Sequence, residues 1–481
     1  MSQSIVGNCA LKPSSIDPID ACLELNRRAA GDPIFKSDAN PPHPASNIPW
    51  RISPEPFCIS KGTYLYLKSL GTHLLRFYQA ANKLYYESAK GTRAPWVAEY
   101  LDQGKPQALI DYQRMNRQKR LLPAIIRPDL IFTEDGRAIA CELDSIPGGQ
   151  GFVASLSEQY AHLGFEVVGG QDGLLQGFAS MLRAQAPEVA DPEVAIVISQ
   201  ESSDYWHEMI YVSQALTTKG LLKSYVVRPE ELRYVDDAFY LGETKIDVVY
   251  RFFELFDLKN VPKTELLMYA AKKQQVVVTP PFKTFLEEKM LFGLFHHPML
   301  KEYWTQELGS EGFYALERLL PRTWIVDPRP MPPHGVIPGL TIDGKPVNDF
   351  RQLMQTTKKQ RDYVLKPSGF SELAWGSRGI SFGSDLPVEE WGQRLEKAFE
   401  SFPDTPYLLQ EYHKPAKVQS RYYDFTRGEV RSFEGRARLC PYYYVEGDQA
   451  QLSGILVTVC PADKKAIHGM TDSIMVPAMV E

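Results

Sequence analysis

The chain has 481 residues, 44% of them hydrophobic and 23% charged, a composition that is typical of globular proteins and excludes collagen-like, coiled-coil and prion-like chains. Its length favours two or three domains. With 53 basic and 59 acidic residues, a net charge of −6 and no dense run of Lys or Arg, we expect no nucleic-acid partner.

The first part of the chain is predicted to be an extended arm followed by helix. Residues 1–50 are rich in Pro, Ser and Asn, which favours an irregular segment. From Gly62 to Ser88 apolar residues recur at steps of three and four, a pattern that indicates one amphipathic helix or two. We therefore expect residues 1–120 to form an N-terminal arm and helical region.

The next two sections are predicted to mix strands and helices. In residues 121–185, the strand-like runs PAIIRPDLIFT and AIACELD flank the turn dipeptide Asp135-Gly136, which predicts a hairpin, and the tight loop PGGQG then leads into a helix. Residues 186–280 alternate strands (PEVAIVIS, SYVVRPEEL, KIDVVYRFF, QQVVVTPP) with a helix, as in a parallel α/β layer. Residues 281–481 alternate helices and strands, which suits an α+β nucleotide-binding unit.

Three acidic residues mark the predicted hairpin. Glu142 and Asp144 are two residues apart on one strand, so their side chains share a face, and Asp129 can meet them from the neighbouring strand. Convergent carboxylates repel one another unless a cation neutralises them, and hard oxygen ligands select Mg²⁺. Arg127, on the same face as Asp129, could hold a phosphate or carboxylate. The alternative is an ordinary solvated sheet face.

A lysine and a glycine-rich loop form the second candidate site. In YVLKPSGFSELAWGSRGISFG, an apolar strand delivers Lys366 and precedes Gly369, Gly376, Gly379 and Gly383. Backbone amides of such a loop can bind phosphates, with the lysine as a point charge. The alternative is a lysine at a strand end beside an ordinary flexible loop.

Two further patterns are weaker. Gln410 and Glu411, in the strand YLLQEY, could hydrogen-bond an adenine amino group or ribose hydroxyls, although Gln-Glu at a strand end is common. Lys289 in LEEKMLFGLF could equally be the charged edge of an amphipathic helix. P-loop, protein-kinase, GxSxG and HExxH motifs are absent from the sequence.

Together, the strand-Lys-Pro with its glycine-rich loop, the Gln-Glu strand and the carboxylate triad resemble the ATP-grasp enzymes. The carboxylates precede the lysine, so the chain resembles the circularly permuted, glutathionylspermidine synthase-like group, from about Ile126 to Glu481. The resemblance implies a permuted ATP-grasp fold with a parallel α/β layer and an N-terminal helical region. It implies that Asp129, Glu142 and Asp144 bind Mg²⁺ and that Arg127 contacts the γ-phosphate or acyl phosphate. It implies further that the ATP phosphates are bound by Lys289, Lys366, Gly376 and Gly379. Gln410 and Glu411 are implied to form the adenine hinge.

Two departures from that group's pattern are visible. Asp144 stands where the group more often has Asn, which keeps an oxygen ligand but adds a charge. The loop after Lys366 is longer than a compact glycine loop, so WGSRG is an alternative phosphate cover.

The resemblance implies an ATP- and Mg²⁺-dependent ligase that joins a small-molecule carboxylate to an amine through an acyl phosphate. Weaker substrate candidates are Arg436 and Arg438, which alternate with apolar residues on one strand, Arg251 after DVVY, and Ser145 beside the PGGQG loop. Structural salt bridges are the alternative for Arg436 and Arg438. The competing functions are an ATP-binding scaffold or pseudoenzyme without turnover and a metal-assisted hydrolase that needs no ATP.

The cysteines and the hydropathy bear on location. The six cysteines form no CxxC pair, and the first residues lack a signal pattern, so we expect a cytoplasmic protein in a reducing compartment. No run approaches the ~18 apolar residues that a membrane-spanning helix needs. The oligomeric state is left open by the sequence.

Overall fold

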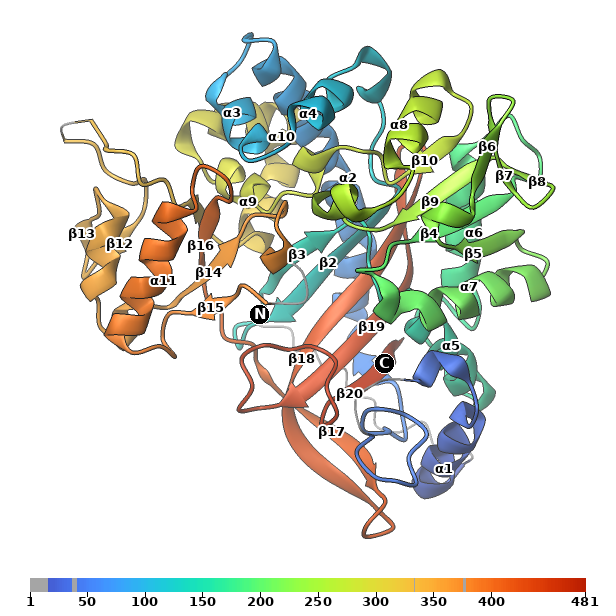
Figure 1. Cartoon of the computed structure of the whole chain (residues 1–481). Helices are drawn as coiled ribbons and strands as arrows, with labels where there is room; N and C mark the ends of the chain where they lie inside the picture. Colours follow the sequence, from blue (N-terminus) through green and yellow to red (C-terminus); the bar gives the residue numbers. More distant parts are fainter. Residues whose placement is uncertain (1–15, 37–40, 333, 375–377) are drawn as a thin grey trace. The chain divides into compact units, whose positions relative to one another are not determined.

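The computed structural model describes the whole chain except residues 1–15, 37–40, 333 and 375–377 (Figure 1). The chain divides into two compact units, and each unit is built from separate stretches of sequence. Unit 1 comprises Met1–Leu75, Pro123–Pro280 and Lys414–Glu481, and unit 2 comprises Arg76–Leu122 and Pro281–His413. The helix α2 (Lys61–Ala89) is continuous and contributes to both units, so the amphipathic run forms one helix rather than two.

A seven-stranded, mostly antiparallel sheet is the centre of unit 1. Its order is β1-β20-β19-β18-β2-β3, with β17 paired to β18, and only β1 and β20 are parallel. The predicted hairpin is confirmed: β2 and β3 are antiparallel, and Gly136 takes a φ of 79° in the turn between them. The strands are β1 (Phe57–Ile59), β2 (Ile125–Phe132), β3 (Ala138–Asp144), β17 (Lys417–Asp424), β18 (Glu429–Glu446), β19 (Gln449–Pro461) and β20 (Ile474–Val480).

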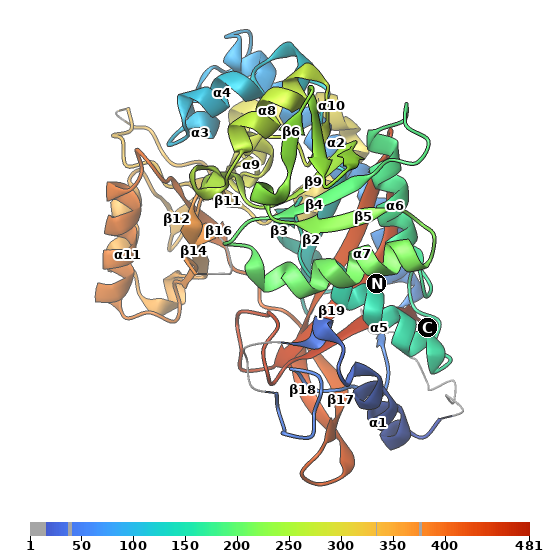
Figure 2. The ribbon, with the colours of Figure 1, turned by 45° about the vertical axis from the view of Figure 1, so that its right-hand side comes forward.

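Unit 1 also contains the predicted parallel layer. Its strands pair in the order β10-β9-β4-β5, all parallel, and every residue of β4 and β9 is buried, as expected for strands covered on both faces. The helix α7 packs along β5 and β4 (Figure 2). The strands are β4 (Val194–Ile198), β5 (Ser224–Val227), β9 (Val248–Phe252) and β10 (Val277–Thr279), with a separate small sheet of β6 (Arg233–Val235), β7 (Ala238–Leu241) and β8 (Thr244–Ile246).

Helices link the two sheets of unit 1. The helix α6 contacts β18 and β19 of the large sheet and β9 of the parallel sheet, while α5 contacts β19, β20 and α7. Their apolar faces therefore complete the hydrophobic core of this unit. The helices are α1 (Pro18–Ala29), α5 (Gln150–His162), α6 (Gly173–Gln185), α7 (Trp206–Thr218) and α8 (Thr264–Lys273).

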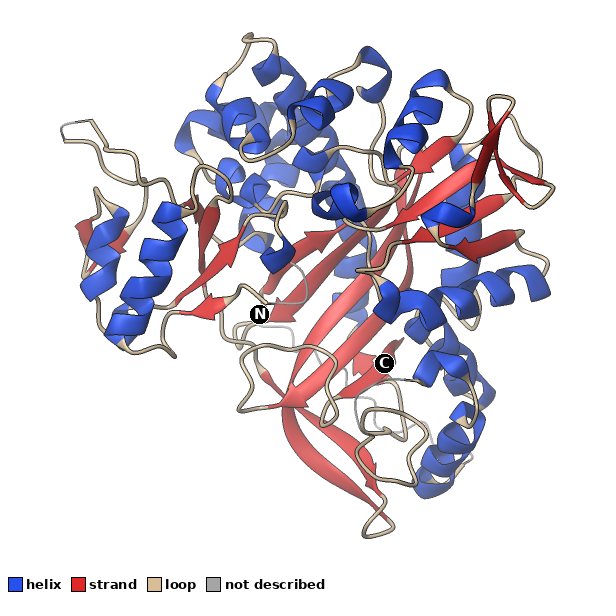
Figure 3. Cartoon of the chain, in the orientation of Figure 1, coloured by secondary structure: helices blue, strands red, loops and turns tan. Residues whose placement is uncertain are grey.

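Unit 2 combines a helical group with a short-stranded antiparallel sheet (Figure 3). The sheet has the order β11-β16-β14-β15, and α11 packs its apolar side chains, among them Trp391 and Leu395, into the core of this sheet. The elements are α3 (Trp96–Asp102), α4 (Gln107–Gln113), α9 (Met290–Phe295), α10 (Lys301–Leu319), β11 (Thr323–Ile325), β12 (Thr341–Ile342), β13 (Lys345–Pro346), β14 (Tyr363–Pro367), β15 (Ser381–Phe382), α11 (Val388–Glu400) and β16 (Tyr407–Glu411).

The units differ from the predicted ranges in two places. The C-terminal strands β17–β20 belong to unit 1 rather than to a nucleotide-binding section over 281–481, because β18 hydrogen-bonds to β2. Residues 76–122, expected within an N-terminal region, belong to unit 2. Pairing between strands distant in sequence decides the first point, and packing of the helix α3 against α9 decides the second. Local patterns carry no signal for either contact.

Two observations concern the cell-location expectations. Among the described residues, no helix is long and apolar enough to cross a membrane. Cys58 is disulfide-bonded, whereas Cys22, Cys141, Cys440 and Cys460 are free.

Candidate functional site

The β2–β3 hairpin of unit 1 brings the predicted acids and Arg127 together. Asp129 lies opposite Glu142, and Arg127 lies opposite Asp144, in the antiparallel register. Nη2 of Arg127 is 3.0 Å from Oδ1 of Asp129 and 3.0 Å from Oδ2 of Asp144. The predicted meeting of these residues across the hairpin is therefore present, with the guanidinium bridging two carboxylates.

Asp129 is enclosed by donors from the neighbouring strand β18. Nη1 of Arg438 lies 2.9 Å from its Oδ2, and the Cys440 thiol donates to its Oδ1 at 3.3 Å. Burial and the charge of Asp129 raise the pKa of the Cys440 thiol to about 12, so this thiol stays protonated as a donor. Burial lowers the pKa of Arg438 and Asp129 raises it, with a net rise, so Arg438 stays charged. Arg438 thus binds Asp129 through Nη1.

Glu142 and Asp144 are the carboxylates with oxygen chemistry suited to Mg²⁺. Burial raises the pKa of Asp144, while Arg127 opposes that rise, and the Ile146 amide donates to its Oδ1 at 2.8 Å. Mg²⁺ commonly takes one or two protein carboxylates and completes its shell with water and phosphate. Glu142 and Asp144 are of the type that this requirement names, although each oxygen of Asp144 already accepts from one protein donor. Asp129 accepts from three protein donors and is the more committed carboxylate. Within the described residues, no group of three or more His, Cys, Asp and Glu side chains is spaced to hold a metal.

The PGGQG loop ties Arg127 to the start of α5. The Gly148 carbonyl accepts from Nη1 of Arg127 at 2.9 Å and from the Tyr442 hydroxyl at 2.7 Å. A Cβ at Gly148 would lie 2.0 Å from a ring carbon of Tyr205, so only glycine fits there. Ser145, the weak substrate candidate in this loop, is buried.

Glu208 is a site residue that sequence reasoning missed. It lies on α7, is buried, and accepts from the Gly151 amide at 3.0 Å at the N-terminus of α5. Burial raises its pKa to about 7, against the lowering effect of amides of the glycine loop and of Arg127. The only sequence signal is one acid in the otherwise apolar run WHEMIYV, and such an acid normally lies on a helix's solvated face.

Two of the proposed substrate arginines have structural tasks instead. Arg251 is fully buried, and its Nε and Nη1 lie 3.1 Å from the Pro280 carbonyl and 2.5 Å from that of Phe253. Arg436 donates to the carbonyls of Ala462 and Pro415, each at 2.8 Å. Their donors are committed to buried backbone, so the geometry does not support substrate contacts by either side chain.

The sheet of unit 2 has one face in the α11 core and a second, buried face that carries both polar and apolar side chains. By register, Lys366, Gln410 and Thr323 share a face, whereas Leu365, Leu409 and Trp324 lie on the other, in the core with α11. Nζ of Lys366 is 2.7 Å from Oε1 of Gln410, which in turn donates to the Thr323 hydroxyl at 3.3 Å.

Glu411 follows Gln410 on β16, so its side chain leaves by the opposite face. The two predicted hinge side chains are therefore not brought together. Of the two predicted hinge residues, only Gln410 shares a face with Lys366.

The loop that follows β14 lies against the other predicted lysine. Nζ of Lys289 donates to the Ala374 carbonyl at 3.2 Å. The Gly379 amide donates to the Leu373 carbonyl at 2.9 Å, and a Cβ at Gly379 would lie 2.7 Å from a Pro367 ring carbon. Gly376 lies outside the described residues. Lys289 thus contacts the loop that follows the strand of Lys366.

No protein-family model and no curated protein matches this sequence. Among solved structures, a glutathione synthetase-like effector from Globodera pallida in its apo form is similar over 100% of both chains, with 13% identity and a TM-score of 0.57. A putative gamma-glutamylcysteine synthetase from Methylobacillus flagellatus KT covers 84% of each chain, with 10% identity and a TM-score of 0.41.

The first likeness defines a class of fold. The chain has the mixed α/β fold of the glutathione synthetase-like effector, with parallel and antiparallel sheets, over its full length. At this identity the likeness shows the fold alone. The activity must be argued from the two residue groups described above.

Proposed function

We propose that the protein is an ATP- and Mg²⁺-dependent ligase that joins a carboxylate to an amine through an acyl phosphate, with the permuted ATP-grasp arrangement. The observation that carries this proposal is the contact between the buried Lys366 and Gln410, on the face of the unit 2 sheet that is turned away from the α11 core. A lysine at the end of a buried strand, followed by a glycine-bearing loop, suits nucleotide phosphates. The synthetase-like fold supports the same reading.

In unit 2, the proposal assigns ATP binding to Lys366, Lys289 and the loop after β14. Both lysines now donate to uncharged protein oxygens, of Gln410 and Ala374 respectively. Phosphate oxygens are stronger acceptors for ammonium groups than these neutral oxygens. On ATP binding we expect both ammonium groups to turn to phosphate, with Gln410 left available to the base or ribose.

In unit 1, the proposal assigns Mg²⁺ to Glu142 and Asp144, and a substrate carboxylate or acyl phosphate to Arg127. The bound ion would offset charge on phosphate oxygens. Asp129, Asp144 and the Gly148 carbonyl fix the guanidinium of Arg127, so a bound anion would compete with these acceptors for its Nη1 and Nη2 donors. Asp129, held by Arg438 and Cys440, orients Arg127 and is the weaker candidate for a metal ligand.

The reaction then has two steps. A substrate carboxylate oxygen attacks the γ-phosphorus of ATP, the bond to the β–γ bridging oxygen breaks, and acyl phosphate and ADP form. An amine next attacks the acyl carbon, phosphate leaves, and the amine loses a proton as the amide forms. Water must be excluded between the steps because it would hydrolyse the acyl phosphate. The acid and the amine are small molecules whose identity the proposal leaves to experiment.

A direct test measures phosphate and ADP release from ATP and Mg²⁺ with pooled amino acids, small peptides and polyamines. Wild type is compared with Lys366→Met, Glu142→Ala and, as a matched control, Lys397→Met on the exposed face of α11. We expect substrate-dependent release that falls at least 100-fold in the first two variants and is unchanged in the third. ATP binding without turnover in any pool would favour a scaffold, and turnover without ATP would favour a hydrolase.

A further inference from the structure

A fully buried ion pair lies beneath the loop that follows β14. Nζ of Lys105, between α3 and α4, is 2.5 Å from Oε1 of Glu288, and their side chains are 1% and 0% exposed. Burying two charges is costly unless further hydrogen bonds satisfy them, so such pairs need a specific surrounding. In this protein, the start of the candidate phosphate loop supplies such hydrogen bonds to Glu288, whereas among the described residues Nζ of Lys105 makes none beyond the ion pair.

The second oxygen of Glu288 binds the first two residues of that loop. Oε2 accepts from the Gly369 amide at 3.1 Å and from the Ser368 hydroxyl. A Cβ at Gly369 would lie 2.2 Å from the Glu287 carbonyl oxygen, so the two backbones touch without room for a side chain. The Phe370 ring lies 5.6 Å from Nζ of Lys105. Three consecutive residues after β14 thus contact the pair.

The next residue after Glu288 holds the far end of the same loop. Lys289 donates to the Ala374 carbonyl, so neighbouring residues at the start of α9 bind both ends of residues 368–374. Lys366 lies two residues before Ser368, on the buried strand β14. Glu288 therefore contacts the chain two residues after Lys366 and directly precedes Lys289.

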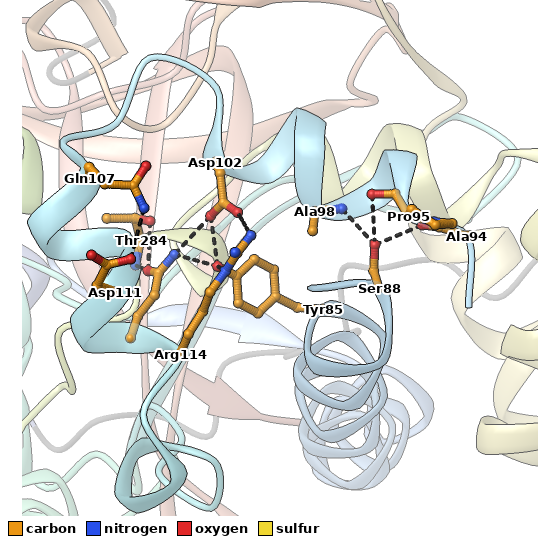
Figure 4. Close-up of polar contacts among 11 residues, drawn as sticks. Tyr85, Ser88, Ala94, Pro95, Ala98, Asp102, Gln107, Asp111, Arg114 and Thr284 are labelled. Atoms are coloured by element: carbon orange, nitrogen blue, oxygen red, sulfur yellow. Dashed lines mark hydrogen bonds and ion pairs between the residues drawn. The ribbon is translucent and has the colours of Figure 1, made fainter. Parts of the chain in front are cut away.

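The helices α3 and α4 fix the segment that carries Glu288 at a second point (Figure 4). Oε1 of Gln113, at the end of α4, accepts from the amide and hydroxyl of Thr284 at 3.0 and 2.9 Å. Its Nε2 donates to the Tyr85 hydroxyl at 2.8 Å and to Asp102 at 3.0 Å. One end of α4 thus holds Thr284, and Lys105 just before the other end holds Glu288.

From this geometry we propose that the Lys105–Glu288 pair positions the loop 368–374 for ATP, with Glu288 as a positioning residue that acts through Ser368 and Gly369. The inference rests on the proposed function for its ATP readout, but the order of the loop can be measured without any ligand. It also gives the helical region between α2 and β2 a task in nucleotide binding.

The test uses the full chain and four variants. Glu288→Gln leaves Lys105 as an uncompensated buried charge. Lys105→Met leaves Glu288 as an uncompensated buried charge. The double variant Lys105→Met/Glu288→Gln removes both charges together. The control is Lys83→Met/Glu307→Gln, which removes another ion pair of unit 2, also 2.5 Å long but partly exposed and remote from the loop in its contacts.

Hydrogen exchange of peptides spanning 368–374 and calorimetric ATP binding are then measured. We expect exchange at least tenfold faster in Glu288→Gln, and ATP affinity at least fivefold weaker in a double variant that melts within a few degrees of wild type. Loop exchange at the wild-type rate in both Glu288→Gln and the double variant would overturn the positioning role. A folded double variant that binds ATP with wild-type affinity would also overturn it. If Glu288→Gln speeds loop exchange as expected but the wild type binds no ATP, the positioning role stands and only the proposed function is overturned.

Discussion

Arg127 and Asp144 face each other across the β2–β3 hairpin, and the same guanidinium nitrogen that reaches Asp144 also reaches Asp129. This bridge keeps two neighbouring carboxylates together on one sheet face without a metal. Burial lowers the pKa of Arg127, but the charges of Asp129 and Asp144 raise it further, so the net pKa is well above its ordinary value. Arg127 therefore stays charged between these two carboxylates.

Replacing Arg127 tests this bridge. Arg127→Met leaves both carboxylates without their shared partner and should lower the free energy of unfolding by about 3–5 kcal/mol, as for other broken buried pairs. Arg127→Lys should give an intermediate loss because an ammonium lacks the planar fork. Urea unfolding measures both. Arg137→Met in the same hairpin, whose pair with Asp135 is exposed, should cost less than about 1 kcal/mol. Equal effects at the two arginines would contradict the bridge.

Glu208 should make the free energy of unfolding depend on pH in the acid range. Its folded-state pKa of about 7 lies above the ordinary 4.5, so the folded protein binds more protons between these values. The free energy of unfolding should fall as pH rises from 4.5 through 7, by about 3 kcal/mol at most. Glu208→Gln should flatten this slope in unfolding measured at a series of pH values. The exposed Glu188→Gln should keep it, and a slope that survives in Glu208→Gln would refute the assignment.

Lys283 should make the free energy of unfolding depend on pH in the alkaline range. It is buried, with Nζ 2.7 Å from Asn82 Oδ1 and 2.6 Å from the Leu121 carbonyl, and burial lowers its pKa from 10.5 to about 7. The unfolded chain then binds more protons between pH 7 and 10.5, so stability should rise with pH there, by roughly 1.4 kcal/mol per unit. Lys283→Met should remove this rise. Exposed Lys397→Met serves as the control, and an unchanged rise in Lys283→Met would rule out Lys283 as its source.

The close approach at Gly148 should make that position intolerant of any side chain. Gly148→Ala places a methyl group on the Tyr205 ring and should cost about 2 kcal/mol or more, since the loop is also held by Arg127. Gly392, within α11, has no neighbour closer than 3.7 Å to an added Cβ. Gly392→Ala should therefore leave thermal unfolding unchanged or shift it upward, by the helix propensity of alanine. A tolerated Gly148→Ala would contradict the described packing.

The local parts of the candidate site could be predicted from the sequence. The Asp135-Gly136 turn and the two-residue period placed Asp129, Glu142 and Asp144 on one hairpin face, and the apolar run before Lys366 placed that lysine on a strand. The sequence did not indicate residues whose role depends on distant partners. Arg251 and Arg436 resembled substrate contacts because their backbone acceptors lie far along the chain or in irregular loops. Glu288 and Glu208 drew no attention because acids in helical segments are usually solvated.

The sequence by itself determined the period of each element, the hairpin turn and the residues able to carry phosphate and metal chemistry, because these depend on neighbours a few positions away. Only the tertiary structure decided which strands pair and which charges are buried. It placed β18 beside β2, so that Arg438 and Cys440 enclose Asp129, and it brought Lys105 to Glu288. Burial and long-range pairing are properties of the packed chain, and the energy of a charge depends on them more than on its neighbours in sequence.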